Sequence, residues 1–144
     1  MKKDRSNDIS GSGIDESLPR AKILRGRKNF QRLFEQDAKT IRNTIVDLRF
    51  KILESDSSGC LMGFVVKKSL GKANKRNHMK RLLKEAYRRH QNILSEPIEN
   101  ADKMFHGALM AKTTDAKYTD VEQNIIALLS KVRDQLSTTS PGHS

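Results

Sequence analysis

Residues 67–89 combine a strong positive charge with a helical repeat of apolar side chains, and this constrains the fold more than any other stretch. The segment holds ten basic side chains and one acidic side chain, for a net charge of +9. Its apolar side chains recur at the spacing of an α-helix with about 3.6 residues per turn: Met79, Leu82, Leu83, Ala86 and Tyr87. We therefore expect a helix from about Ala73 to Leu94, ended by Pro97, that is buried on one side and cationic on the other.

The cationic side of this helix admits three interpretations. Arg76, Lys80 and Lys84 lie one above another at every fourth position, with Arg88 one turn further on. A merely solvated face would carry acidic partners at i+4, and these are almost absent. A helix on a membrane surface would need its apolar side for lipid, and this one lacks Trp. Nucleic-acid binding is favoured, because Asn77 in the same patch can hydrogen-bond to sugar or phosphate.

The charge of the whole chain also indicates a polyanionic partner. The 144 residues have a net charge of +11, of which a second basic block at residues 20–51 contributes +7. No apolar run reaches the ~18 residues of a membrane span, and the N-terminus shows no secretory pattern. Cys60 is the single cysteine, so no internal disulfide can form. We expect a cytoplasmic protein with no membrane partner.

Two strands are predicted before the basic helix and one after it. Residues 45–53 alternate apolar and polar side chains, as half-buried strands do. Residues 60–66 are almost wholly apolar, which suits a strand covered on both faces. A turn signal at residues 54–59 joins the two, so we expect a hairpin. Residues 103–111 read as the third strand, with a short extra strand at 39–42.

A short helix and a long helix flank these strands. Residues 27–36 place one apolar stripe on a short helix, formed by Phe30, Leu33 and Phe34. The final helix is expected to begin near Thr119, because Thr119 and Glu122 match a capping box. Its apolar stripe comprises Val121, Ile125, Leu128, Leu129, Val132 and Leu136. This order of elements predicts an α+β fold.

The two ends of the chain have the composition of disordered tails. Residues 1–17 are rich in Ser, Gly, Asn and Asp, and residues 138–144 read the same way. We therefore expect one RNA-binding domain at residues 18–137.

The string KKSLGKANKRNHMKRLLKEAYR resembles the signature of the bacterial ribonuclease P protein component. That family shows a Lys-Lys pair, a small residue, Arg-Asn, a further basic residue, Lys-Arg-Leu, and a Glu/Gln-Ala/Ser-aromatic sequence. The matching positions are Lys67, Lys68, Ala73, Arg76, Asn77, Lys80, Arg81, Leu82, Glu85, Ala86 and Tyr87. The upstream string LPRAKILRGRKNFQRLF is similar to the start of the family, and the resemblance spans about residues 18–137.

The resemblance implies a fold and a function. The fold is a single four-stranded sheet packed with three helices, with a left-handed β-α-β crossover through the basic helix, as in the second domain of ribosomal protein S5. The function is to bind the catalytic RNA of ribonuclease P and the 5′ leader of precursor tRNA, which the holoenzyme removes by endonucleolytic cleavage. The catalytic centre, with its Mg²⁺, would lie in the RNA. For this chain we expect no catalytic residue, no metal ligand, no tightly bound cofactor and no required protein partner.

The resemblance also implies two sets of binding residues. The set for the RNA subunit comprises Lys67, Lys68, Lys72, Arg76, Asn77, Lys80, Arg81, Lys84 and Arg88. The set for the leader comprises Phe30, Phe34, Leu48, Phe50, Arg27, Lys28, Arg32 and Arg49. Stacking of bases on aromatic rings tolerates different sequences, which suits leaders that vary. Core packing alone is the alternative for Phe30 and Phe34.

Two positions depart from the family pattern. His78 stands where the family usually has Arg, so one phosphate contact is expected to be weaker or pH-dependent. A third aromatic residue commonly lies on the strand that faces the Phe pair, and by position it falls at Leu48 or Phe50.

Two other functions stay open. A ribosome-associated or other structural RNA-binding protein would share the charge and the size. A stand-alone nuclease would need clustered carboxylates to hold Mg²⁺. The acidic residues of the two basic blocks show no obvious pair and are only Glu35, Asp37, Asp47 and Glu85.

Overall fold

Strand β4 (Met104–Ala111) lies inside a four-stranded sheet with the order β1-β2-β4-β3. β1 (Lys39–Ile41) pairs antiparallel with β2 (Val46–Leu53), which in turn pairs antiparallel with β4. β3 (Gly59–Val65) pairs with β4 in parallel. Because parallel neighbours need a crossover connection, the chain must cross one face of the sheet between β3 and β4.

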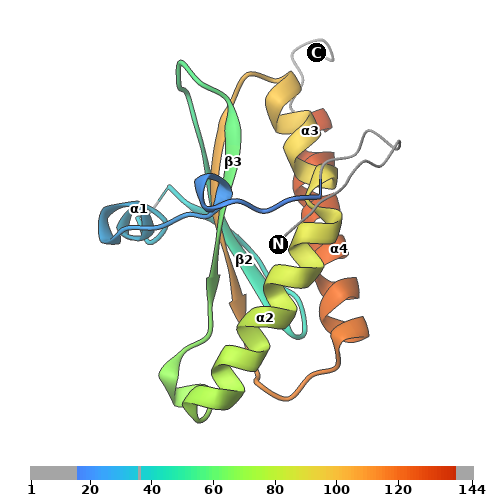
Figure 1. Ribbon diagram of the computed structural model, residues 1–144. Helices are drawn as coiled ribbons and strands as arrows, with labels where there is room; N and C mark the ends of the chain where they lie inside the picture. The colour runs from blue at the N-terminus through green and yellow to red at the C-terminus, as the bar shows by residue number, and fades with distance from the viewer. Residues whose placement is uncertain (1–15, 36, 139–144) are drawn as a thin grey trace, which may run out of the picture.

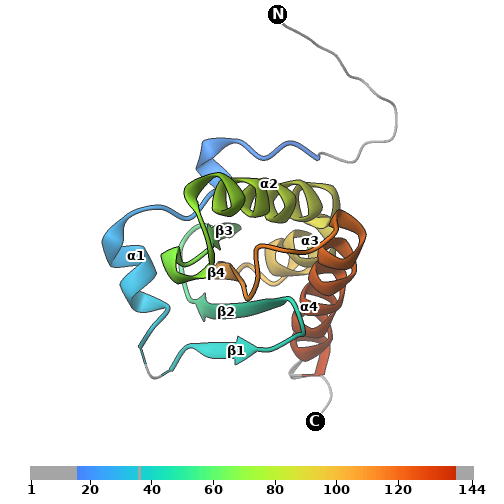
Figure 2. The same cartoon turned by 90° about the horizontal axis from the view of Figure 1, so that it is seen from below.

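Helices cover the two faces of the sheet unequally (Figure 1). The computed structural model describes residues 16–35 and 37–138. In chain order its helical elements are η2 (Arg20–Lys22), α1 (Arg27–Arg32), η3 (Lys68–Leu70), α2 (Ala73–His90), α3 (Asn92–Asn100) and α4 (Tyr118–Thr138). α2, α3 and α4 lie on one face, and the short α1 lies on the other (Figures 1 and 2).

The main core fills the space between the sheet and α2, α3 and α4. Val46, Leu48 and Phe50 of β2 point into it and are at most 2% exposed, as the period of two predicts. The buried helical side chains are Met79, Leu83, Ala86, Tyr87, Leu94, Ile98, Val121, Ile125, Leu128, Leu129 and Val132. The predicted apolar sides of the basic and final helices are therefore confirmed, with Leu82 and Leu136 partly buried at their margins.

A smaller cluster holds α1 against the other face of the sheet. Its buried members are Leu24, Leu33 and Ala108, and Phe30, Leu61, Val65 and Met110 pack around them. In the sheet register, Gly63 of β3 and Arg49 of β2 lie on either side of Ala108. The absence of bulk at Gly63 and Ala108 lets α1 approach the strands closely. The predicted aromatic pair is thus on the sheet face opposite to the main core.

The predicted hairpin between residues 45–53 and 60–66 is wrong. β2 and β3 both pair with β4, which lies between them. Six of the eight residues of β4 are buried, and a strand that is apolar on both faces favours an interior position. The turn signal shows where the chain reverses, but it does not decide which strands become neighbours.

The prediction that Pro97 ends the basic helix is wrong, because Pro97 lies inside α3. α2 ends at His90 and α3 continues from Asn92, so the described residues form four α-helices rather than three. Leu94 and Ile98 on either side of Pro97 are fully buried. Their packing on the core outweighs the one backbone hydrogen bond that a proline removes.

The predicted capping box at the start of the final helix is also wrong. α4 begins at Tyr118, so Thr119 lies in its first turn rather than at the N-cap. Glu122 instead contacts α2, with its Oε2 2.7 Å from Nε2 of His90. This pair ties the end of α2 to the second turn of α4.

The predicted tails lie mostly outside the described residues, which exclude 1–15 and 139–144. Glu16 and Ser17 are described: Glu16 contacts Arg88 of α2, and Ser17 contacts Gln91 directly after α2, so the packed part of the chain begins before residue 18. Within the described ranges, no helix has both the length and the hydrophobicity to cross a membrane. The left-handed sense of the crossover stays a prediction.

Candidate nucleic-acid interface

The cationic side of α2 and its entrance face outward and form one surface. We call it the α2 basic face, made of Lys67, Lys68, Lys72, Arg76, Asn77, Lys80, Arg81 and Lys84; Arg76 and Lys80 are half-buried and the others are exposed. None of these side chains forms an ion pair with another described residue. Like charges at this density repel one another, and a bound polyanion would relieve that repulsion.

The entrance of α2 is fixed by hydrogen bonds to the loop before it. Arg76 Nε donates to the carbonyl oxygen of Gly71 at 3.0 Å. Thr114 Oγ1 donates to the carbonyl oxygen of Leu70 at 3.3 Å. Arg76 therefore supports the loop as well as carrying charge. His78 is exposed on the same helix, and its weaker or pH-dependent contact stays a prediction.

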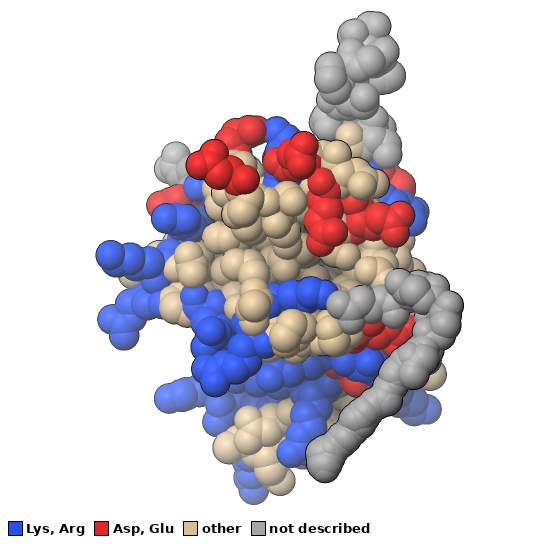
Figure 3. All heavy atoms as spheres, turned by 45° about the horizontal axis from the view of Figure 1, so that its top comes forward, with Lys and Arg blue, Asp and Glu red and all other residues tan. Residues whose placement is uncertain are grey.

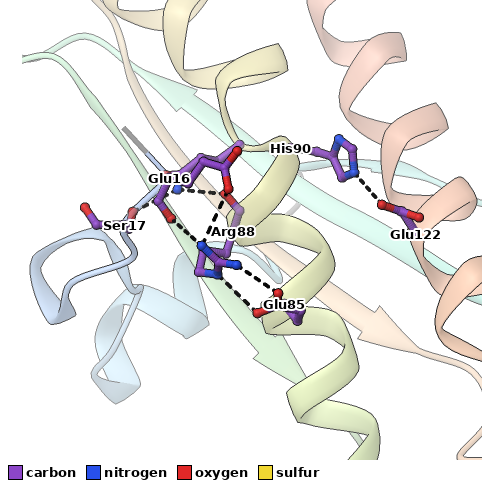
Figure 4. A network of polar contacts seen from close by, with 7 residues as sticks. Glu16, Ser17, Glu85, Arg88, His90 and Glu122 are labelled. Carbon is purple, nitrogen blue, oxygen red and sulfur yellow. Dashed lines mark hydrogen bonds and ion pairs between the residues drawn. The ribbon is translucent and has the colours of Figure 1, made fainter. Parts of the chain in front are cut away.

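Arg88, predicted as part of the same cationic set, is engaged by acidic groups of the protein itself (Figure 4). Its Nη2 lies 2.8 Å from Glu85 Oε2, and its Nη1 lies 3.6 Å from Glu16 Oε1. Nη1 also donates to the carbonyl oxygen of Glu16 at 3.3 Å. The hydrogen bond from Arg88 holds the pKa of Glu85 below its usual value, so Glu85 is ionised and the pair persists.

This network anchors the N-terminal segment to α2. Beside Arg88, Gln91 Nε2 donates to the carbonyl oxygen of Ser17 at 2.8 Å, and Gln91 is buried. Leu18 then packs against the main core. The charge of Arg88 is already balanced by Glu16 and Glu85, so Arg88 is not part of the α2 basic face.

The two phenylalanines of the predicted leader site have different environments. Phe30 is half-buried and packs on the sheet beside Leu24 and Gly63. Phe34 is 60% exposed, the largest exposure of any bulky apolar side chain among the described residues. Core packing therefore accounts for much of Phe30, but it does not account for Phe34.

The prediction that Leu48 or Phe50 faces this pair is wrong. Leu48 is 0% and Phe50 is 2% exposed, and both lie in the main core on the far side of the sheet. The strand residue that faces Phe34 is Arg49, whose guanidinium carbon lies 5.5 Å from the centroid of the Phe34 ring. Successive side chains of a strand alternate between the two faces of the sheet. An error of one residue in the position therefore places a core residue where a residue of the open face belongs.

Further cations surround this open face. Arg27, Lys28 and Arg32 of α1 are exposed, and their contact with leader phosphates stays a prediction. Lys51, which the sequence did not single out, follows Arg49 on the same side of β2 and pairs with Glu35 at 2.9 Å and with Asp37 at 3.2 Å. Its alternation with Arg49 was the signal that could have found it.

The carboxylates of the two basic blocks are all held in ion pairs. These pairs are Glu35–Lys51, Asp37–Lys51, Asp47–Arg42, Asp47–Lys112 and Glu85–Arg88. Among the described residues, no group of three His, Cys, Asp or Glu side chains lies together as a metal site would require.

Charge is segregated across the molecule (Figure 3). Lysines and arginines gather over α1 and the start of α2, in the left and lower parts of the view. The end formed by the β2–β3 turn and α3 carries exposed acidic residues, namely Glu54, Asp56, Glu96, Glu99 and Asp102. A polyanion would be attracted to one side of the molecule and repelled at this end.

Residues 18–133 match the family model described as Ribonuclease P. The chain belongs to the ribonuclease P protein family. Among its relatives, the ribonuclease P protein component of Thermotoga maritima is 34% identical over 81 residues, which cover 56% of this chain and 67% of the relative. That of Alkaliphilus oremlandii is 31% identical over 111 residues, which cover 76% of this chain and 89% of the relative.

Solved structures of ribonuclease P proteins share the fold. The protein from Thermotoga maritima superposes with a TM-score of 0.60 at 25% identity, covering 76% of this chain and 96% of that chain. The protein from Staphylococcus aureus superposes with a TM-score of 0.59 at 18% identity, covering 81% of this chain and 93% of that chain. At this identity the likeness shows the fold alone. The predicted family and α+β fold are confirmed: this is a protein subunit of ribonuclease P, an endoribonuclease holoenzyme that works with an RNA.

Proposed function

We propose that this subunit binds the catalytic RNA of ribonuclease P through the α2 basic face and the 5′ leader of precursor tRNA through the open sheet face beside α1. The observation that carries the proposal is the separation of the two surfaces. The α2 basic face carries cations that form no ion pair with another described residue. The open sheet face beside α1 combines cations with the exposed ring of Phe34. The first suits a phosphate backbone, and the second suits unpaired nucleotides.

The two surfaces would act together by electrostatics. The catalytic RNA and precursor tRNA are both polyanions and repel each other. A protein that places cations toward both lowers this repulsion and raises the affinity for substrate and for the divalent ions that the RNA needs. The acidic end at α3 and the β2–β3 turn would face away from both RNAs.

In this proposal the cleavage chemistry, with its Mg²⁺, belongs to the RNA and not to this chain. In support, the described carboxylates nearest to the two surfaces are ion-paired with lysines and arginines, and among the described residues no three His, Cys, Asp or Glu side chains lie together as a Mg²⁺ site would require. The protein contributes binding and orientation, and no side chain of it enters the reaction.

Reconstitution with the catalytic RNA tests the proposal. Precursor tRNA is incubated at low Mg²⁺ with the protein, with the RNA, or with both, and the released leader is measured. We expect efficient cleavage only with both components, and tighter binding of precursor tRNA than of mature tRNA. Cleavage by the protein alone would make it a nuclease in its own right, and the absence of any stimulation would favour a ribosome-associated role.

A further inference from the structure

The guanidinium of Arg49 donates three hydrogen bonds to the segment that follows α1. Nε donates to the carbonyl oxygen of Leu33, and Nη2 donates to that of Glu35 at 3.1 Å. Nη1 donates to Thr40 Oγ1 at 2.8 Å. The carbonyl of Leu33, the C-cap of α1, has no partner within the helix, and Arg49 on the neighbouring strand supplies one. The Glu35 carbonyl, in the turn after the helix, accepts from Arg49 and also from the backbone N–H of Ala38. Arg49 thus fixes the path of the chain on both sides of Phe34.

The same guanidinium also contacts the ring of Phe34. The distance of 5.5 Å from its central carbon to the ring centroid is that of a cation–π contact. Phe34 is nevertheless 60% exposed, so much of its ring remains open to solvent. An exposed ring at the end of a six-residue helix would otherwise sample several rotamers, and the contact with Arg49 favours one of them.

We propose that Arg49 is a positioning residue: it holds the ring of Phe34 ready for a leader base and does not itself bind a leader phosphate. The proposal rests on the leader site proposed above. It replaces the expectation that Arg49 lies near the phosphates, because three of the five N–H groups of the guanidinium are already engaged with the protein. Affinity for the leader then depends on Arg49 only through Phe34.

A double-mutant cycle in the reconstituted holoenzyme tests this. Binding of precursor tRNA and mature tRNA is measured for Arg49→Ala, Arg49→Lys, Phe34→Ala and the two double variants. We expect Arg49→Ala and Arg49→Lys each to weaken precursor binding about 3- to 10-fold. Lysine keeps the positive charge, but it lacks the planar guanidinium that donates several hydrogen bonds at once and contacts the Phe34 ring. Phe34→Ala should weaken it about 5- to 100-fold. In the Phe34→Ala background, both Arg49 substitutions should have no further effect.

Two further readouts separate positioning from a phosphate contact. The salt dependence of precursor binding should be the same for Arg49→Ala and the natural protein, because no phosphate contact is lost. A 2-aminopurine placed in the leader should be quenched by stacking in the natural holoenzyme and less so in Arg49→Lys. Affinity for the RNA subunit should not change in any variant, which shows that the domain remains folded.

The outcomes that overturn the proposal are distinct. Full affinity in Arg49→Lys together with a smaller salt slope in Arg49→Ala would make Arg49 a phosphate contact. A loss from Arg49→Ala that persists in the Phe34→Ala background would show that it acts independently of the ring. Equal loss for precursor and mature tRNA would show only a structural role. If Phe34→Ala alone spares precursor binding, the leader site itself is wrong, and the positioning role falls with it.

Discussion

The ring of Phe30 occupies the space in front of Gly63: a Cβ built on this glycine would lie 2.6 Å from Phe30 Cζ and 2.9 Å from Cε1. Real Cβ atoms do not approach other atoms so closely, so no other residue fits at position 63 while the Phe30 ring stays in place. Glycine at this position therefore lets the Phe30 ring of α1 lie directly against the sheet.

Gly63→Ala should displace α1 and lower the free energy of unfolding by about 1–3 kcal/mol, as overpacking does. Urea unfolding measures the loss, and precursor binding should fall while affinity for the RNA subunit is kept. Gly59→Ala on the same strand is the matched control, because its Cβ would meet Met104 Cε at an ordinary 3.7 Å. Equal effects of the two substitutions would show that contact with Phe30 is not the cause.

Lys84 and Arg88 lie one turn apart on α2 but should respond differently to substitution. Lys84 is exposed and has no ion pair with a described residue, whereas Arg88 is held by Glu16 and Glu85. Lys84→Ala should reduce the salt slope of binding to the RNA subunit by about 0.7–0.9 log units, one phosphate contact's worth. Arg88→Ala should leave that slope unchanged.

The affinity of each variant and of the natural protein for the RNA subunit is measured at several salt concentrations, and the slopes are compared. Lys131→Ala on α4, an exposed cation outside the α2 basic face, controls for net charge. If Arg88→Ala reduces the slope as much as Lys84→Ala does, RNA displaces Glu16 from Arg88, and the exclusion of Arg88 from the interface is wrong.

His106 should make stability fall at mildly acidic pH. It is 7% exposed, and its Nδ1 has no hydrogen-bond partner among the described residues. Burial, with the positive charge of Arg32, lowers the pKa of His106 below 6.5. The unfolded chain therefore takes up the proton first, and the stability contributed by neutral His106 is lost as the pH falls from about 6.5 toward the lower folded pKa.

His106→Leu should remove this part of the pH dependence. Free energies of unfolding are measured for both proteins between pH 8 and pH 5, and the difference between them isolates the one side chain from the other histidines. We expect the natural protein to lose stability relative to the variant as the pH falls. Parallel curves would mean that His106 titrates alike in the folded and unfolded states.

Cys60 should be nearly inert in the folded protein. Burial raises the pKa of its thiol to about 12, although the Tyr87 hydroxyl lies 3.4 Å from the sulfur. Only the thiolate reacts with iodoacetamide, so labelling at pH 8 should be at least ~100-fold slower than in the urea-unfolded chain. Similar rates in both states would show that this part of the core opens readily.

The elements of this fold could be predicted from short-range patterns, but their neighbours could not. The alternation at Val46, Leu48 and Phe50 identified β2, and the stripe at Met79, Leu83 and Tyr87 identified the buried side of α2. The apolar run of β4 favours an interior strand, but which strands lie beside it depends on contacts far apart in the sequence, so no local pattern identifies β2 and β3 as its neighbours.

The candidate site was predictable to the same degree. The positions of the cations of α2 follow from helical geometry alone: none is buried, although Arg76, Lys80 and Arg88 are partly covered. The residue that faces Phe34 is Arg49 rather than Leu48 or Phe50, its neighbours on either side in the sequence; the family pattern leads to an aromatic or apolar partner, but the apolar side chains of β2 face the main core. The engagement of Arg88 could not be foreseen, since Glu16 is 72 residues away in the sequence.

The attachment of Glu16 and Ser17 to α2 has a practical consequence for labelling this protein. A group attached at Glu16 or Ser17 would lie beside the end of the helix that carries the α2 basic face, where its bulk or charge would compete with RNA. α4, in contrast, ends at Thr138 near the acidic end of the molecule. Fluorophores should therefore be attached toward the end of α4 rather than at Glu16 or Ser17.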